Sequence, residues 1–167
     1  AAGDIVDNHI VTAAVDAPNV FLLGRNIGLA TALEVNATTL LDARPALSAN
    51  INDVDGISSV LLIQAITAAG APIRLSSTGG SLGLSFVSGT GETHISAAGF
   101  LLSAPGASTD VVAPTLLLDG GLGVGSGSET IRMDAGTLET TSNGNILITD
   151  VNNLIVLEAT ALSPGAF

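Results

Sequence analysis

The chain has 167 residues, of which 47% are hydrophobic and only 2% aromatic, and it contains no cysteine. Fifteen acidic residues against four arginines and no lysine give a formal net charge of −11. Without cysteine there can be no disulfides, thiolate metal sites or cysteine nucleophiles. So acidic a chain, with no cluster of cations, is not expected to bind nucleic acid or an anionic membrane surface.

The apolar residues are Val, Leu, Ile and Ala rather than aromatic residues, and the mean hydropathy is +0.60. Uniform side chains of small and medium size suit a narrow, repetitive interior. The longest apolar runs, such as residues 59–63, have the length of a strand. None approaches the roughly 18 residues that a membrane-spanning helix needs, so no membrane insertion is expected. No signal peptide is visible at the start of the chain.

Short apolar or alternating segments recur along the chain, whereas helical periodicity is hard to find. Such segments between clusters of turn residues are typical of strands. The separators are rich in Gly, Asn and Asp, which accept the positive φ angles of sharp bends. One of them, Asn143-Gly144, fits either a type I′ hairpin or the corner of a solenoid. In chain order the predicted strands are residues 19–23, 38–41, 59–63, 81–87, 115–118, 130–133, 145–149 and 154–157.

An internal repeat relates two parts of the chain at an offset of about 96 residues. Residues 17–71 resemble residues 113–166 in collinear order, and residues 72–96 have no second copy. Among the matched pairs, Val20 aligns with Leu116. A chain that repeats itself in this way is usually a stack of similar units, each of which buries its apolar face on the next.

In the C-terminal half, two or three short strands occur within about 20 residues, which is the coil length of a parallel β-helix. We therefore expect an all-β fold, a parallel β-helix (β-solenoid) with rungs of about 20 residues, running as one continuous unit over residues 1–167. Leu117 and Leu147 are expected inside the coil. The competing fold is a tandem pair of β-sandwich repeats, because about 96 residues is also the size of a sandwich domain. The scarcity of aromatic core residues counts against the sandwich.

A further pattern consists of the glycine-rich residues 121–125, the pair Ile131-Arg132 and the run of residues 135–150. These segments resemble the repeats of filamentous-haemagglutinin-like, "β-strand repeat" bacterial surface adhesins, which carry G-x-G, an apolar residue followed by Arg, and L-x-A/T-x-T-x-x-G-x-I-x-I. The resemblance covers about residues 121–157 and is faint over residues 17–63. It implies a right-handed parallel β-helix at the bacterial cell surface, with an extracellular role in adhesion or fibre building and no catalysis.

Two oxygen-rich turns are the candidates for a cofactor site. Asp53 and Asp55 resemble a fragment of a calcium loop, but the residue eleven positions after Asp53 is Gln64 rather than a bidentate Glu. Capping of the turns by the same side chains is the simpler interpretation, and no other cofactor is expected. The weak calcium candidates are Asp53, Asp55, Asp150 and Asn152.

No catalytic residues are predicted. The two histidines, His9 and His94, do not lie in a pattern that indicates a catalytic triad. Residues 120–125 have the glycine density of a phosphate loop, but no Lys-Ser or Lys-Thr pair follows them. We therefore expect a protein that is not an enzyme.

The expected function is structural: a non-catalytic extracellular protein that forms an adhesin stalk or a filament by stacking of rungs. Its expected partner is a further copy joined head-to-tail, or the continuation of a larger repeat array. The alternative is a surface module that binds carbohydrate or calcium through a lateral face.

Overall fold

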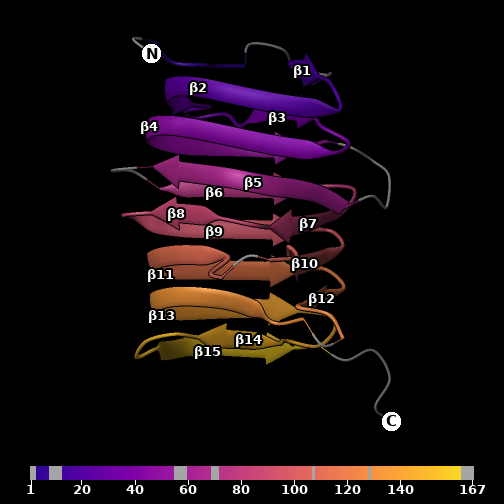
Figure 1. Cartoon of the computed structure of the whole chain (residues 1–167), viewed down its shortest axis with the longest axis vertical. Coiled ribbons are helices and arrows are strands. Elements are labelled where there is room, and N and C mark those ends of the chain that lie inside the picture. The colour runs from indigo at the N-terminus through magenta and orange to yellow at the C-terminus, as the bar shows by residue number, and fades with distance from the viewer. Residues whose placement is uncertain are drawn as a thin grey trace.

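The computed structural model describes residues 3–7, 13–54, 60–68, 72–106, 108–127 and 129–162. Within these segments every regular element is a strand, and all pairings between named strands are parallel. The strands stack into one coil whose axis runs the length of the molecule (Figure 1). The expected β-solenoid is therefore confirmed, and the β-sandwich is excluded because its neighbouring strands would run antiparallel.

Each turn of the coil has two arms, which we name the front arm and the back arm from the view in Figure 1. Four strands begin in the front arm and bend around a corner into the back arm: β2 (Asn19–Ile27), β4 (Leu40–Asp53), β11 (Val111–Gly120) and β13 (Ile131–Ser142). The other front strands are β5 (Val60–Ala68), β7 (Ser81–Leu84), β8 (Val87–Gly89), β10 (Phe100–Ser103), β12 (Gly123–Val124) and β14 (Ile148–Asp150). The other back strands are β1 (Val15–Asp16), β3 (Leu33–Asn36), β6 (Ile73–Ser77), β9 (Glu92–Ala97) and β15 (Ile155–Ala161).

The coil is right-handed. In Figure 1 the chain descends from the N-terminus, the front strands β5 and β8 point to the left, and the back strands β6 and β9 point to the right. A descending chain that crosses the front leftward and the back rightward traces a right-handed helix. This is the handedness usual for connections between parallel strands.

The length of each turn follows from one inward ladder of the back arm, which is a row of inward-pointing side chains that stack from turn to turn. Its members follow from the pairing register of the successive back strands, and their spacing along the chain varies from turn to turn. The rungs are about 21 residues long, close to the predicted length. The ladder consists of Ile27, Ala49, Ile73, Thr93, Leu116, Leu138 and Val156.

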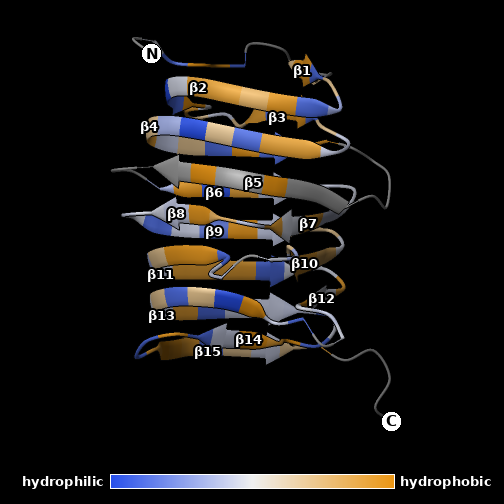
Figure 2. Ribbon diagram, viewed as in Figure 1, coloured by the Kyte–Doolittle hydropathy of each residue, from blue (hydrophilic) through white to orange (hydrophobic). Residues whose placement is uncertain are grey.

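The core fills the space between the front and back arms. Alternate residues of each strand point inward, so apolar and polar residues alternate along the chain (Figure 2). In β6, for example, Ile73 and Leu75 are buried while Arg74 between them is exposed. Nearly all buried apolar side chains are Val, Leu, Ile or Ala, as the composition indicates.

Two residues that we expected in the core lie outside it. Leu116 and Leu118 are fully buried, whereas Leu117 is only half-buried and lies in the outer ladder with His94 and Glu139. Leu147 is also half-buried. A run of consecutive apolar residues does not show which alternate residues point inward, and a shift of one residue exchanges the two faces.

Glycines at the corner between back and front arms let the backbones of successive turns approach closely. A Cβ on Gly121 would lie 2.1 Å from the carbonyl oxygen of Ala98, and one on Gly144 would lie 2.0 Å from that of Leu122. Asn143-Gly144 is thus a solenoid corner rather than a hairpin. Only glycine can occupy these positions without pushing the turns apart.

The internal repeat relates opposite arms of the coil. Val20 belongs to a front ladder with Leu41, whereas its sequence partner Leu116 lies in the back ladder. Likewise, Ile51 lies on the back arm and its partner Ile148 on the front arm. The offset of the repeat therefore equals about four and a half turns of the coil. The two matched segments have a similar order of inward apolar residues, but where one segment lies on the front arm the other lies on the back arm.

Candidate functional site

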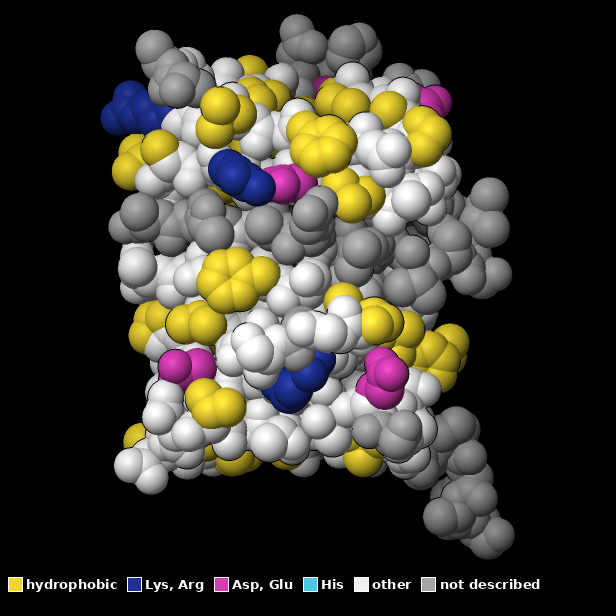
Figure 3. All heavy atoms as spheres, viewed as in Figure 1, with side chains coloured by type: hydrophobic (Ala, Val, Ile, Leu, Met, Phe, Trp, Pro, Cys, Tyr) yellow, Lys and Arg dark blue, Asp and Glu magenta, His cyan; other side chains and the backbone are white. Residues whose placement is uncertain are grey.

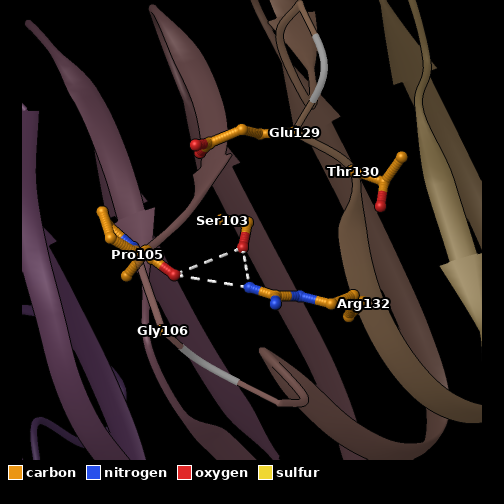
Figure 4. Close-up of a pocket in the computed structure, with 7 residues that line it drawn as sticks. Ser103, Pro105, Gly106, Glu129, Thr130 and Arg132 are labelled. Carbon is orange, nitrogen blue, oxygen red and sulfur yellow. Dashed lines mark hydrogen bonds between the residues drawn. The ribbon is translucent and has the colours of Figure 1, made fainter.

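A hollow lined partly by polar side chains lies on the front arm, where β10 ends and β13 begins (Figure 4). It has a volume of about 190 Å³ and is open to solvent on one side. The chain leaves the regular coil here, in the connection between β10 and β11 that includes residues 104–106. The residues that line the hollow are Ser103, Ala104, Pro105, Gly106, Glu129, Thr130 and Arg132.

A buried carboxylate beneath this hollow holds the Arg132 side chain in place. Asp110 is fully buried, and its Oδ2 accepts a hydrogen bond of 2.7 Å from the backbone nitrogen of Arg132. The guanidinium reaches both carboxylate oxygens, with Nε and Nη2 each at 3.4 Å. Asp110 and Arg132 are separated by one turn of the chain, so the parallel register places one residue directly over the other.

The same guanidinium also fixes the start of the connection. Its Nη2 donates to the hydroxyl of Ser103 and, at 3.3 Å, to the carbonyl oxygen of Ala104. Ser103 Oγ in turn donates to Asp110 Oδ1 at 3.1 Å. The positive charge is thereby balanced by Asp110, and this cluster of Ser103, Asp110 and Arg132 joins two turns of the coil. Its geometry suits a structural clamp on the start of the connection between β10 and β11.

His94 forms a second polar cluster, on the outer side of the back arm. Its Nε2 lies 2.7 Å from Asp119 Oδ2, one turn along the axis. Thr141, on the following turn, donates its hydroxyl to Asp119 Oδ1. Asp119 therefore links three successive turns through their side chains. His9 lies outside the described residues.

The calcium candidates are divided between the two arms. Asp53 is buried on the back arm, where Oδ1 accepts from the Ala37 nitrogen and Oδ2 from the Ser77 hydroxyl, both at 3.3 Å. Asp150 lies on the front arm, where Oδ2 accepts from the Ala135 nitrogen at 3.1 Å.

Both aspartates therefore cap the backbone of the preceding turn. Asn152 donates its backbone nitrogen to Asp150 at 2.8 Å and its side-chain amide to Asp134 at 2.6 Å. Asp55 lies outside the described residues. Over the described part of the chain, no three His, Cys, Asp or Glu side chains gather closely enough to hold a metal ion.

A patch near the N-terminal end of the front arm combines apolar groups with an ion pair. Phe21 and Leu23 are 68% and 67% exposed, and they lie beside Asp42 and Arg44 in the next strand. Arg44 makes two hydrogen bonds of 2.9 Å to the Asp42 carboxylate. Its hydrogen bonds to Asp42 and the negative charge of that carboxylate raise the pKa of the Arg44 guanidinium. Figure 3 shows exposed hydrophobic side chains at this end of the front face.

The C-terminal end of the described coil is an uncovered rung. The backbone of β15 pairs with β13 on one side and with no described strand on the other. Ile155, Val156 and Leu157 are 61%, 53% and 59% exposed. Val156 belongs to the inward ladder, and its side chain is exposed because no further turn of the described residues covers it.

The clamp was not predicted from the sequence. The sequence does contain features that could have predicted the clamp. Arg132 belongs to the apolar-Arg pair of the adhesin-like motif, and Asp110 precedes it by one rung length. The exposed apolar run of residues 155–157 was predicted as a strand, but its position on the last turn follows only from the coil.

Comparisons with family models, with curated proteins and with solved structures each return no match for this chain. Over the described residues there is no helix of the length and apolarity required to cross a membrane.

Proposed function

We propose that this chain is a non-catalytic structural protein of the bacterial cell surface, which forms a stalk or filament by stacking solenoid rungs end to end. The observation that carries this proposal is the uncovered C-terminal rung. There, Ile155, Val156 and Leu157 expose large apolar surfaces beside a strand edge that pairs with no described strand. Soluble proteins usually cover or charge such an edge, because it pairs readily with another strand.

The inward ladders support stacking because they continue to the last turn. Leu138 is buried beneath Val156, and Val156 would be buried in the same way by one further rung. Each added turn would also satisfy the open backbone groups of β15. Stacking of this kind relies on main-chain hydrogen bonds and needs little specific sequence. The extracellular location and the adhesin role rest on the resemblance of residues 121–157 to surface-adhesin repeats.

Sedimentation velocity of the purified chain and of two acidic variants tests the proposal. Val156→Asp places a charge on the uncovered rung, where the side chain is already half exposed. Leu122→Asp is the matched control, because Leu122 is 56% exposed but lies at a corner in the middle of the coil. We expect large, concentration-dependent assemblies for the parent chain and the control, and monomers for Val156→Asp. Monomers for all three chains would contradict the proposal.

A carbohydrate-binding module is the second candidate, and the patch of Phe21, Leu23, Asp42 and Arg44 favours it. The patch borders a hollow of about 300 Å³ and offers an aromatic ring beside a fixed ion pair. Apolar and aromatic walls with a few oriented polar groups are typical of ligand sites. Thermal-shift titrations with a panel of sugars, and separately with calcium, test this alternative. A specific rise in melting temperature with one sugar that Phe21→Ala abolishes would support it.

A further inference from the structure

The phenylalanines that the structure describes all lie outside the core. Four residues of the chain are phenylalanine, and there is no tyrosine or tryptophan. The described ones are Phe21, Phe86 and Phe100, and none of them belongs to the buried core. Phe21 is 68% exposed and Phe86 is 38% exposed. A chain with so few aromatic rings, which leaves them at its surface, is expected to use them for binding rather than for folding.

Phe21 and Phe86 lie in one column of the front arm, which we call the front column. A column is a row of pairing positions on successive turns, and its register follows from the neighbouring inward positions, which pair from Leu22 to Met133. The two phenylalanines point outward, because Leu22 and Val87 beside them point inward. They are three turns apart, or about 14 Å along the axis at about 4.8 Å per turn. The front column consists of Phe21, Asp42, Ala65, Phe86, Asp110 and Arg132.

Each ring lies one turn before a buried aspartate that holds an arginine. Asp42 accepts two hydrogen bonds of 2.9 Å from Arg44, which lies two residues further along the same strand. Asp110 accepts from the backbone and the side chain of Arg132, which lies one turn further along the coil. A ring and a guanidinium group fixed by a carboxylate therefore occur twice on the front face.

Both guanidinium groups are accessible to a ligand. Arg44 lines a hollow of about 300 Å³ and Arg132 a hollow of about 190 Å³ (Figures 3 and 4). Nη1 of each arginine has no acceptor among the described residues. These N–H groups can donate to hydroxyl oxygens, while the rings offer apolar faces. A sugar, which has hydroxyl groups around an apolar ring face, meets both requirements.

The charges of the two places favour an uncharged ligand. Each arginine is balanced by its aspartate, so neither place offers a net positive charge to an anion. The whole chain carries a formal net charge of −11, which repels polyanions. The front strands between the two rings are already paired on both sides, so a peptide could not add there as a further strand.

We propose that the front column binds an extended, uncharged polysaccharide, which runs parallel to the solenoid axis and contacts both rings. This inference rests on the second candidate function, carbohydrate binding, and adds a second contact site and the direction of the bound chain. The alignment of the two rings in a straight column favours a polymer, since a single sugar cannot span about 14 Å. Two contacts on one ligand chain also strengthen binding, because the second contact forms within the complex.

Isothermal titration calorimetry with oligosaccharides tests the proposal, because it measures affinity per chain whether or not the chain assembles. The probes are cellohexaose, mannohexaose and xylohexaose, with an alginate hexasaccharide as the anionic comparison. We expect at least one uncharged hexasaccharide to bind about tenfold or more tightly than its disaccharide, which is too short to reach both rings. The alginate hexasaccharide should not bind.

Three variants locate the contacts. Phe86→Leu removes the flat ring but keeps an apolar side chain, and Phe21→Ala removes the more exposed ring. In each, we expect the advantage of the hexasaccharide over the disaccharide to fall about fivefold or more. Leu122→Ala is the control, because Leu122 is 56% exposed but lies at a corner outside the front column. It should bind as the parent chain does, and melting temperatures check that all three variants fold.

The outcomes separate this proposal from the functions proposed above. Unchanged binding by Phe86→Leu overturns the extended column, and if Phe21→Ala alone loses affinity, a single sugar site at Phe21 remains. An equal loss in Leu122→Ala also overturns the column. If no uncharged hexasaccharide binds, or if only the alginate hexasaccharide binds, the column is wrong, and the sugar panel decides whether carbohydrate binding survives. End-to-end stacking is measured separately by sedimentation and does not depend on these results.

Discussion

Val20 and Leu116 occupy matching places in the internal repeat, yet they point into the core from opposite arms of the coil. Both are buried, at 3% and 0% exposure. The repeat therefore preserves which residues of an arm point into the core, but it does not preserve whether that arm lies on the front or the back of the coil.

Replacement of Leu116 and Leu117 by aspartate distinguishes the core from the surface within one strand. Leu116→Asp puts an unpaired charge into the inward ladder, and we expect a loss of more than about 4 kcal/mol or no folded protein. Leu117→Asp, on the outer ladder, should cost less than about 1 kcal/mol. Urea denaturation followed by circular dichroism measures both. Equal losses would show that the inward register of β11 is wrong.

Thr93→Val should stabilise the protein. The Thr93 side chain is fully buried in the inward ladder, and its hydroxyl has no hydrogen-bond partner over the described residues. Valine has nearly the same shape and no buried polar group, so we expect a gain of about 1 kcal/mol in the free energy of unfolding. Thr141→Val is the control, because Thr141 donates to Asp119, and it should give no gain. A destabilised Thr93→Val chain would show that the hydroxyl has a partner.

Gly121→Ala should weaken the corner between β11 and β12. The added Cβ would lie 2.1 Å from the Ala98 carbonyl oxygen, a backbone atom that cannot move without separation of two turns. We expect a cost of about 2 kcal/mol or more, measured as a fall in melting temperature. Gly3→Ala serves as the control, since no atom lies within 4 Å of its added Cβ. An unchanged melting temperature for Gly121→Ala would contradict the close approach of the turns.

Arg132→Met should destabilise the clamp by about 3 kcal/mol, because Asp110 would remain buried without its counter-charge. Addition of Asp110→Asn to the same chain should recover part of this loss, since it removes the unpaired charge. Arg74→Met is the control, because the Arg74–Glu92 pair is exposed on both sides and should contribute less than about 1 kcal/mol. A double variant no more stable than Arg132→Met would contradict the coupling between Asp110 and Arg132.

Much of the solenoid was predictable because its strands are short apolar runs between turn residues. Predicted residues 115–118 lie within β11, and residues 130–133 extend from just before β13 into it. Strands β6 and β9 were missed, since Arg74, His94 and several serines interrupt their apolar residues. The rungs also differ in length, which blurs the period, so the register between turns could not be counted from the sequence.

The candidate sites were harder to predict because they depend on which residues stack across turns. Asp110 and Arg132 belong to no shared sequence motif, and only the ladder of β11 on β13 brings them together. The calcium candidates Asp53 and Asp150 look alike in sequence, but they lie on opposite arms, and each accepts a backbone hydrogen bond from the preceding turn. Which residues lie side by side in a solenoid depends on the length of each rung, and a longer connection, such as the one between β10 and β11, changes that length.

Electron microscopy of the purified chain, combined with fibre diffraction, tests the central claim most directly. Rung-on-rung stacking predicts unbranched filaments with a strong axial reflection near about 4.8 Å, because the strands lie perpendicular to the filament axis. Discrete particles the size of one chain, at concentrations where the chain remains folded, would contradict the proposal that this solenoid functions by end-to-end assembly.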